Sequence, residues 1–476
     1  MKFLPDKFRS FRTNYKLSQR EVANLLGISD RAISKWENGL SIPSSEHLVM
    51  LAKIFNIKVH DFFDTDEDGF KVTKHTAMES IKELYRIGRG PSSSHTIGPE
   101  RACKIFKNKY PADTYKAVLY GSLAKTGKGH GTDEVIKKTF SPTLCEVSFN
   151  LNDTVIPHPN TMDLIAIKDG QIIARERVQS VGGGKILFEN EKERSTFSPY
   201  KEMKFHDIAV LCNERSMRLW QYVEENEEDD FWDYMKEIWE TMKTSIQNGL
   251  RDEGILPGGL GVHKKAKSLY NHQHVDESSQ TKENRLVCSY AFAISEQNAS
   301  GETIVTAPTC GSAGVLPSVL YYQQIKNGYS DTEIIHALAT AGIIGNLIKT
   351  NASISGAECG CQAEIGTACA MASAALGELF DLNIDKIEYA AEIAIEHHLG
   401  LTCDPICGLV QIPCIERNAV AAMRAINAVN LASFLWDTRK ISFDRVVETM
   451  RETGHDLNPS YRETAEGGLA KITDLR

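Results

Sequence analysis

The sequence predicts a multidomain protein with an all-α N-terminal module, an α+β domain and an all-α C-terminal domain. The 476 residues allow about three domains at roughly 100–200 residues each. Strand-like runs are confined to the middle of the chain, and alanine-rich helical stretches punctuated by glycine dominate its last part. Acidic runs mark both transitions. We therefore expect domains at residues 1–64, 78–222 and 223–476, with a linker at 65–77.

The first 64 residues have the pattern of short amphipathic helices joined by a glycine turn. Apolar residues around Val22 and Leu26 fall at helical spacing ahead of Gly27, and further helices are expected over residues 29–36 and 46–55. Two short helices joined in this way are typical of the helix-turn-helix unit. The run LSQREVANLLGISDRAISKWENG resembles the phage-repressor-type helix-turn-helix family, and the resemblance covers nearly the whole module.

This resemblance implies that the second helix of the unit enters the major groove of DNA. The module carries a net charge of +3 and the remainder of the chain −12. Double-stranded DNA is therefore expected as a partner of residues 1–64 only. A module kept for protein interaction or dimerisation is the alternative. The candidate DNA contacts are Gln19, Arg31, Ser34 and Lys35.

The sequence shows no sign of a membrane or secreted protein. No stretch of 18 apolar residues is present, and the first residues lack the apolar core of a signal peptide. We therefore expect a cytoplasmic location without membrane contact. Cytosolic thiols stay reduced, so the eleven cysteines are not expected to form a disulfide framework. Seven of them crowd the last third of the chain: Cys310, Cys359, Cys361, Cys369, Cys403, Cys407 and Cys414.

The two larger domains differ in their expected secondary structure. In the α+β domain, glycine-rich turns separate strand-like runs at 117–120, 145–150 and 164–167. The acidic run EENEEDD at 224–230 is interpreted as a solvated connector, and strand signals are nearly absent after it. Helices are expected over 334–349, 367–380 and 417–437.

Three loop motifs of the α+β domain carry chemically useful side chains. GRGPSSSHTIGP places consecutive hydroxyls and backbone amides where they could grip a carboxylate or phosphate, although a surface turn rich in serine is the plainer interpretation. GKGHGTD sets His130 between glycines that allow close backbone approach. IPHPNTM contains His158 and Asn160. Histidine is the usual general acid or base near neutral pH.

The cysteines of the helical domain do not follow a zinc-ribbon or ferredoxin spacing, because no C-x₂-C pair occurs. Spacing alone leaves open which of six cysteines in GAECGCQAEIGTACAM and GLTCDPICGLVQIPC could hold a metal group. Cys359 and Cys361 would point to nearly opposite sides of a helix. At most one of these two is then expected to face a given cluster.

Taken together, GPSSSHT, GSLAKTGKGHGTD, HPNTM, SVGGG, APTCGSAG, SGAECGCQAEIG and LTCDPICGLVQIPCIERN resemble the iron–sulfur L-serine dehydratase family over residues 78–476. The resemblance implies a single-chain form, with a β-type domain ahead of an α-type domain. It implies a [4Fe–4S] cluster held by Cys361, Cys403 and Cys414, while Cys359, Cys369 and Cys407 are expected to be packing residues. Some relatives also carry a cysteine after the YRET motif, and SYRETAEGGLAKITDLR contains none.

The same resemblance implies conversion of L-serine to pyruvate and ammonia, in which a cluster iron acts as a Lewis acid on the substrate and a base removes the α-proton. His130 and His158 are the catalytic candidates, with His130 the first choice for the base. The candidate substrate-binding residues are Ser93, Ser94, His95, Thr96 and Asn160 on the β-type side, and Thr309, Gly311, Ser312 and Asn351 on the cluster side.

Two alternatives and the oligomeric state complete these expectations. SVGGGK at 180–185 superficially resembles the phosphate cradle of a pyridoxal-phosphate enzyme, but no Schiff-base lysine motif accompanies it. A serine-sensing transcription regulator with an enzyme-derived body is the alternative of another class. A homodimer would suit both the enzyme family and a DNA site of two halves.

Overall fold

The computed structural model describes residues 2–15, 17–55, 57, 62–64, 76–152, 156–189, 197–272, 275–464 and 466–472. Most of the expected linker, residues 65–75, lies outside the described residues. The chain divides into two compact units, residues 1–75 and 76–476. In the described parts of the chain, none of the helices has the length and apolar character that a membrane span requires.

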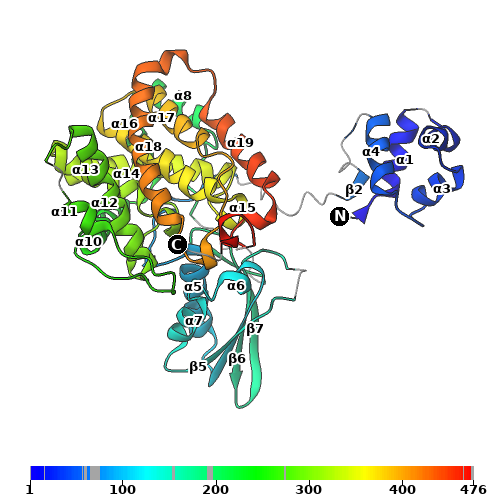
Figure 1. The fold of residues 1–476 in the computed structure, drawn as a ribbon, viewed down its shortest axis with the longest axis horizontal. Coiled ribbons are helices and arrows are strands. Elements are labelled where there is room, and N and C mark those ends of the chain that lie inside the picture. The colour runs from blue at the N-terminus through cyan, green and yellow to red at the C-terminus, as the bar shows by residue number, and fades with distance from the viewer. Residues whose placement is uncertain are drawn as a thin grey trace. The chain divides into compact units, whose positions relative to one another are not determined.

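The N-terminal unit is a small helical module, and its predicted helices are confirmed to within one or two residues. Ser18 and Glu21 form a capping box at the first helix of the helix-turn-helix unit, and Gly27 ends this helix at φ +67°, a conformation that costs glycine little. The core contains Phe8, Ile33 and Trp36, together with neighbouring aromatic rings. The elements are β1 (Lys2–Phe3), α1 (Pro5–Asn14), α2 (Gln19–Leu26), α3 (Asp30–Glu37), α4 (Ser45–Ile54) and β2 (Phe63–Asp64), which pairs with β1 (Figure 1).

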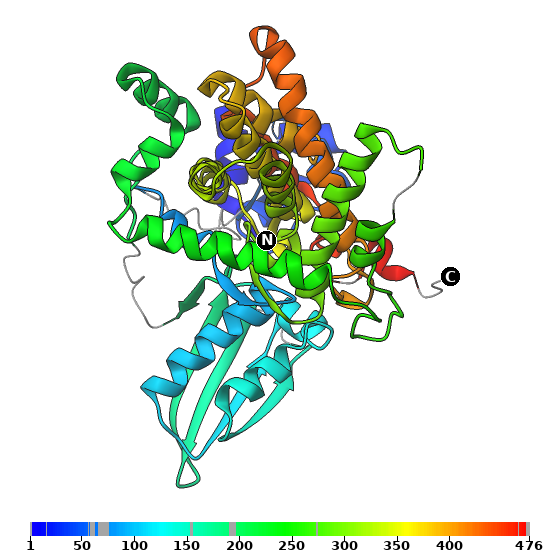
Figure 2. The same cartoon turned by 90° about the vertical axis from the view of Figure 1, so that its left-hand side faces the viewer.

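The second unit contains a five-stranded mixed sheet in the order β5-β4-β6-β7-β8. Strands β4 and β5 run parallel because two helices connect them, and the remaining pairs are antiparallel. Helices α5 and α7 lie against one face of the sheet (Figure 2). The elements are α5 (Gly98–Lys109), β4 (Thr114–Leu119), α6 (Gly121–Thr126), α7 (Thr132–Phe140), β5 (Leu144–Phe149), β6 (Thr161–Lys168), β7 (Gln171–Ser180) and β8 (Ile186–Phe188).

The three strands expected from the sequence are confirmed as parts of β4, β5 and β6. Strand β7 was not expected, since its charged centre, Arg175–Arg177, does not show the apolar alternation of a half-buried strand. The two arginines are paired with an acidic residue, because Asp163 of β6 accepts hydrogen bonds from Arg175 and Arg177 on the neighbouring strand. The predicted α+β class of this part of the chain is confirmed.

The remainder of the second unit is helical and shares one large hydrophobic core. The three helices expected in the sequence are confirmed as α14, α16 and α18, of which α14 and α16 pack against each other (Figure 1). The main helices are α8 (Phe205–Arg215), α9 (Leu219–Asn226), α10 (Phe231–Gly249), α12 (Ser279–Ala299), α13 (Val315–Asn327), α14 (Asp331–Asn351), α16 (Thr367–Leu379), α17 (Ile384–Glu396), α18 (Cys414–Leu435) and α19 (Phe443–Asp456).

The packing adds three details to the sequence expectations. The hydrophobic core of the sheet region contains residues from Ala102 to Phe188, while Met78 to Ile97 and the helices α8 and α9 pack into the helical core. The acidic run 224–230 is not merely a solvated connector, since the Glu227 carboxylate accepts hydrogen bonds from Ile81 N and the Tyr200 hydroxyl. A short strand, β9 (Thr303–Val305), pairs with β3 (Ile87–Arg89) inside the mostly helical region.

Candidate active site

Three cysteines from separate segments meet where the helical region faces the sheet. Cys361 follows the short helix α15 (Gly356–Cys359), Cys403 pairs by a β-bridge with Arg462, and Cys414 begins α18. The sulfur atoms of Cys361 and Cys403 and one carboxylate oxygen of Glu364 lie within 4.8 Å of one another. A hydrogen bond with Cys361, together with burial, raises the pKa of Cys403, and burial with the Cys361 charge raises that of Cys414.

A glycine decides which of the two neighbouring cysteines faces this site. Gly360 adopts φ +73° directly after α15, so Cys359 and Cys361 do not continue one helix. Cys359 instead lies against Gly454 of α19, where a Cβ on that glycine would be 2.5 Å from the Cys359 sulfur. A Cβ on Gly360 would lie 2.7 Å from the Leu401 carbonyl oxygen. The turn therefore requires glycine for both its conformation and its space.

The other two cysteines that were expected to be packing residues, Cys369 and Cys407, differ in their burial. Cys369 is buried in α16, and its thiol donates to the Ala421 carbonyl at 3.3 Å, as expected of a packing residue. Cys407 is exposed and has φ +53°, so the expectation that it packs is wrong.

The convergent thiols have the chemistry of an iron–sulfur site. All three cysteines are buried and free, and thiolate sulfur is the donor that such clusters use. Small residues border them: a Cβ on Gly356 would lie 3.0 Å from the Cys403 sulfur, and one on Gly311 would lie 3.2 Å from the Glu364 carboxylate. Burial by itself would lower the pKa of Arg417, but the charges of Cys361 and Cys414 raise it. These residues fit a cluster held by three thiolates.

The serine-rich loop folds into a buried π-helical turn, η3 (Ser93–Ile97). The interpretation of this motif as a surface turn is therefore wrong. Ser94 Oγ lies 2.8 Å from His95 Nδ1, and Thr126 Oγ1 lies 2.9 Å from His95 Nε2. The Thr126 hydroxyl donates to the Ser122 carbonyl, so it accepts from Nε2–H of His95. The Thr96 hydroxyl donates to Ser92 O within the turn, and Ser93 is buried beside it.

His130 is fully buried beside His95, with their ring centroids 4.4 Å apart. Its Nδ1 lies 2.9 Å from the Thr126 carbonyl oxygen, which can only accept, so Nδ1 carries the proton. Nε2 is then an unprotonated nitrogen, and it has no hydrogen-bond partner among the described residues. Burial lowers the pKa of His130 to about 4, so the ring is neutral at physiological pH.

Sequence reasoning missed one residue of this group, Glu463. Its Oε1 lies 3.7 Å from His95 Nδ1 and 4.0 Å from His130 Nε2. Burial, with the charges of Glu364 and Cys361, raises the pKa of Glu463. The residue belongs to the YRET motif of the tail, which was considered only for its lack of a cysteine. Nothing local in that motif indicates that it meets histidines so far away in the chain.

His158 and Asn160 enter the site region from the loop ahead of β6. His158 Nδ1 accepts the Asn160 backbone N–H at 3.0 Å, and Nε2 lies 3.2 Å from the Glu358 carboxylate. Both ring nitrogens are thus occupied, in contrast to His130. The Asn160 side chain is fully buried, and neither its oxygen nor its nitrogen has a partner among the described residues. Such an amide is free to bind a ligand.

The candidate residues of the cluster side separate into two groups. Thr309 donates to the Glu364 carboxylate at 2.7 Å, its hydroxyl lies 3.1 Å from that of Ser312, and Gly311 borders the same carboxylate. Asn351 lies apart from these contacts. Its amide donates to the Met203 and Leu347 carbonyls at the end of α14.

The SVGGGK loop is engaged in contacts within the protein. The Gly183 and Gly184 carbonyls accept from Arg86 and Arg101, and the Lys185 ammonium pairs with Glu79 at 2.6 Å. A Cβ on Gly182 would lie 3.3 Å from the Ser355 Cβ, so the loop packs against the segment that leads to α15. These contacts account for the motif without a phosphate ligand.

In the N-terminal unit, the candidate DNA contacts differ in their exposure and in their contacts within the protein. Arg31 and Lys35 are exposed on α3, and Ser34 is half-buried. Gln19 donates to the Glu37 carboxylate at 2.6 Å, and Glu37 also pairs with Arg12. Burial opposes ionisation of Glu37, but the hydrogen bonds from Arg12 and Gln19 lower its pKa. The contacts of Glu37 with Arg12 and Gln19 therefore link α1, α2 and α3.

Comparison with known proteins covers nearly the whole chain. The family described as the serine dehydratase alpha chain matches residues 116–470, the serine dehydratase beta chain matches residues 80–141, and a helix-turn-helix family matches residues 8–62. The L-serine dehydratase of Haemophilus influenzae is 38% identical over 449 residues, covering 83% of this chain and 99% of that protein. L-serine dehydratase of Streptomyces coelicolor is 38% identical over 446 residues (82% and 98%), and L-serine dehydratase 1 of Escherichia coli is 37% identical over 448 (83% and 99%).

Proposed function

Because the chain belongs to the L-serine dehydratase family, we propose that it is an L-serine ammonia-lyase that releases pyruvate and ammonia from L-serine. The observation that carries the proposal is the meeting of three buried cysteines with a buried pair of neutral histidines. Thiols that can hold a metal group and a nitrogen that can take a proton are the two requirements of dehydration at an amino acid.

Cys361, Cys403 and Cys414 would hold a [4Fe–4S] cluster. Such a cluster, held by only three protein thiolates, supplies a Lewis acid for the departing hydroxyl group. The surrounding protein groups keep water from the thiols, since all three cysteines are nearly inaccessible. Asn418 fixes the local backbone by donating to the Gly311 and Cys414 carbonyls.

His130 is the base in this proposal. Its Nε2 is unprotonated and unpartnered, and its Nδ1–H is held by the Thr126 carbonyl, so the ring is oriented before substrate binds. Removal of the α-proton with loss of water gives aminoacrylate, which tautomerises and hydrolyses to pyruvate and ammonia. Ser94 and His95, beside His130, and the unpartnered amide of Asn160 would position the substrate. His158 would keep the loop of Asn160 in place.

Double-stranded DNA is the proposed partner of the N-terminal unit, through Arg31, Ser34 and Lys35 of α3 and Gln19 of α2. The exposed positive charges on α3 and the helix-turn-helix match support this assignment. A cytoplasmic homodimer, which we also propose, would offer two such units to a DNA site of two halves.

The test is anaerobic purification of the full chain, with iron and sulfide determined beside pyruvate release from L-serine. We expect about four irons per chain and activity that is lost in air. Cys361→Ala should abolish both iron binding and turnover, while the matched control Cys359→Ala, two residues away and facing Gly454, should retain both. Iron-free protein that still forms pyruvate would contradict the cluster-dependent mechanism. Inactive protein with a full cluster would favour the serine-sensing regulator instead.

A further inference from the structure

Glu463 is a buried carboxylate that lacks a cationic partner. Its nearest basic groups are His95 and His130, and burial lowers the pKa of both rings, so both are neutral at physiological pH. No lysine or arginine forms an ion pair with Glu463 among the residues that the structure describes. Burial, with the charges of Glu364 and Cys361, raises the pKa of Glu463, because a buried carboxylate is costly unless a positive or hydrogen-bonding group compensates it. A cation or a donor that arrives from outside the chain would favour the ionised form of this carboxylate.

The backbone fixes this carboxylate in position from both sides of the site. Glu463 has φ +56°, a region that residues other than glycine rarely adopt. Its N–H donates to the Cys403 carbonyl at 2.8 Å, and its carbonyl accepts from the Ser122 hydroxyl of α6 at 3.0 Å. Unfavourable backbone conformations of this kind persist where the surroundings impose them, and they cluster at functional sites.

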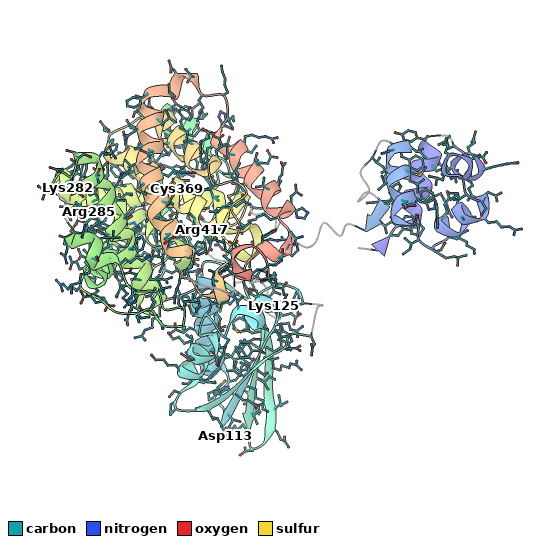
Figure 3. The ribbon with its side chains drawn as sticks, in the orientation of Figure 1. Asp113, Lys125, Lys282, Arg285, Cys369 and Arg417 are labelled. Atoms are coloured by element: carbon teal, nitrogen blue, oxygen red, sulfur yellow. The ribbon has the colours of Figure 1, made fainter. Side chains whose placement is uncertain are left out.

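Further contacts hold the rest of the tail against the same two parts of the protein. The Leu469 N–H donates to the Asp404 carboxylate at 2.9 Å, and Lys125 of α6 pairs with Glu466 at 2.6 Å. Figure 3 shows Lys125 at the end of the sheet region that faces the helical region. Arg417 of α18 is labelled in the helical region. The tail thus delivers Glu463 to the junction of the two halves of the site.

We propose that Glu463 binds the α-ammonium group of L-serine and so presents the α-proton to Nε2 of His130. The inference rests on the proposed function, in which the hydroxyl group of serine is directed to the cysteine side of the site. The ammonium group is the positive part of that substrate, and Glu463 is a carboxylate that directly neighbours the proposed base. Its role is to position the substrate, while His130 accepts the proton.

The distances suit this arrangement. An ammonium nitrogen that donates to the Glu463 carboxylate would lie about 2.8 Å from its oxygen, and the α-carbon follows about 1.5 Å further on. Because Oε1 of Glu463 and Nε2 of His130 are 4.0 Å apart, a substrate held on the carboxylate keeps its α-carbon beside the ring nitrogen. Glu364 is less suited to this role, since Thr309 and Cys361 already contact its carboxylate.

The proposal is tested by the binding of two small ligands that differ only in the ammonium group, L-alanine and propanoate. Neither carries the hydroxyl group that is lost in the reaction, so binding to the cluster-loaded, anaerobic full chain can be followed by calorimetry without turnover. We compare wild type, Glu463→Gln and Glu463→Asp. Glu452→Gln is the matched control, because this glutamate is exposed on α19 and takes no part in the contacts that hold the tail.

Glu463→Gln should weaken L-alanine binding about 10- to 100-fold, the usual effect of losing a hydrogen bond to a charged group, while propanoate binding changes less than about threefold. Glu463→Asp keeps the charge and should bind L-alanine more tightly than Glu463→Gln, and Glu452→Gln should match wild type. Equal losses for both ligands, or no loss for either, would overturn the inference. So would an additional metal ion that wild type binds and Glu463→Gln loses, since His95, His130 and Glu463 are also close enough to share one.

The result also separates this inference from the proposed function. If wild type forms pyruvate from L-serine but Glu463→Gln keeps its preference for L-alanine, only the role of Glu463 is wrong. If wild type neither forms pyruvate nor prefers L-alanine to propanoate, the proposed function and the inference are wrong together. Iron content and thermal melting of each variant show that a loss of binding does not come from a lost cluster or an unfolded chain.

Discussion

Replacing His130 by glutamine tests which histidine removes the α-proton. The Nε2 of His130 has no partner in the described structure, and its Nδ1–H is held by the Thr126 carbonyl. In His158 both nitrogens are occupied, by Glu358 and by the Asn160 N–H. Proton abstraction needs a nitrogen that is free to accept. These contacts support His130, which was also the first choice from the sequence, over His158 as the proposed base.

The expected magnitude follows from what each ring supplies. A positioned general base is worth about 10²–10⁴ in rate, so kcat of His130→Gln should fall by that factor with a small change in KM. His158→Gln is the matched control. It should mainly raise KM, because His158 holds the loop that carries Asn160 rather than accepting the proton. Initial rates of pyruvate formation, measured anaerobically at matched iron content, give both constants.

The pH dependence adds a second measurement. Burial lowers the pKa of His130 to about 4, and the base acts only when unprotonated. The kcat of wild type at saturating L-serine, which reports the base in the substrate complex, should therefore stay level as pH falls from 8 to about 5, instead of declining around 6.5, the ordinary histidine value. His130→Gln with kcat within about threefold of wild type would refute the assignment. A decline centred near 6.5 would show that the base is another, exposed group.

Three further predictions concern other parts of the chain. Arg31→Ala should weaken binding to the gene's own promoter and reduce the slope of log K against log salt concentration by about one. Gel shifts with the promoter and with random DNA measure both effects. Lys53→Ala, at an exposed position on α4, should change neither the affinity nor the slope. Gly360→Ala should lower the melting temperature and the iron content, because its Cβ would meet the Leu401 carbonyl at φ +73°. Gly328→Ala has nearly the same φ in open space, so it should lower the melting temperature less and leave the iron content unchanged. His398, whose pKa burial lowers to about 4, stays neutral in the folded chain while the unfolded chain takes up a proton below pH 6.5. Acidification from pH 7 to 5 should thus cost about 2 kcal/mol of folding free energy through this residue, and His398→Asn should show a smaller fall in melting temperature over that range.

The sequence indicated the parts of this protein whose signals are local. Helical spacing of apolar residues located α3, α4, α14, α16 and α18, since the 3.6-residue period is visible within one segment. Alternation and glycine turns located β4, β5 and β6, but not β7, whose charged residues are balanced by Asp163 on the neighbouring strand. Long motifs in a consistent order indicated the family, which the matches to known proteins confirm.

The functional residues divide in the same way. His130, Asn160 and the three candidate cysteines lie in motifs that sequence reasoning singled out, and their proposed roles stay predictions. The proton position on His130 depends on a carbonyl four residues away in a turn that only the folded chain shows. Asn351, selected from the sequence, holds two backbone carbonyls at the end of α14 instead of joining the contacts around Glu364.

Glu463 shows most clearly what only the tertiary structure decided. The YRET motif that contains Glu463 could be recognised in the sequence. The position of Glu463 depends on hydrogen bonds with Cys403 and Ser122, which lie far apart along the chain. The orientation of Cys361 away from Cys359 similarly depends on one glycine and the carbonyl packed against it. Sequence patterns report the face and period of an element. The meeting of separate segments is set by packing between them, for which a single sequence carries no local signal.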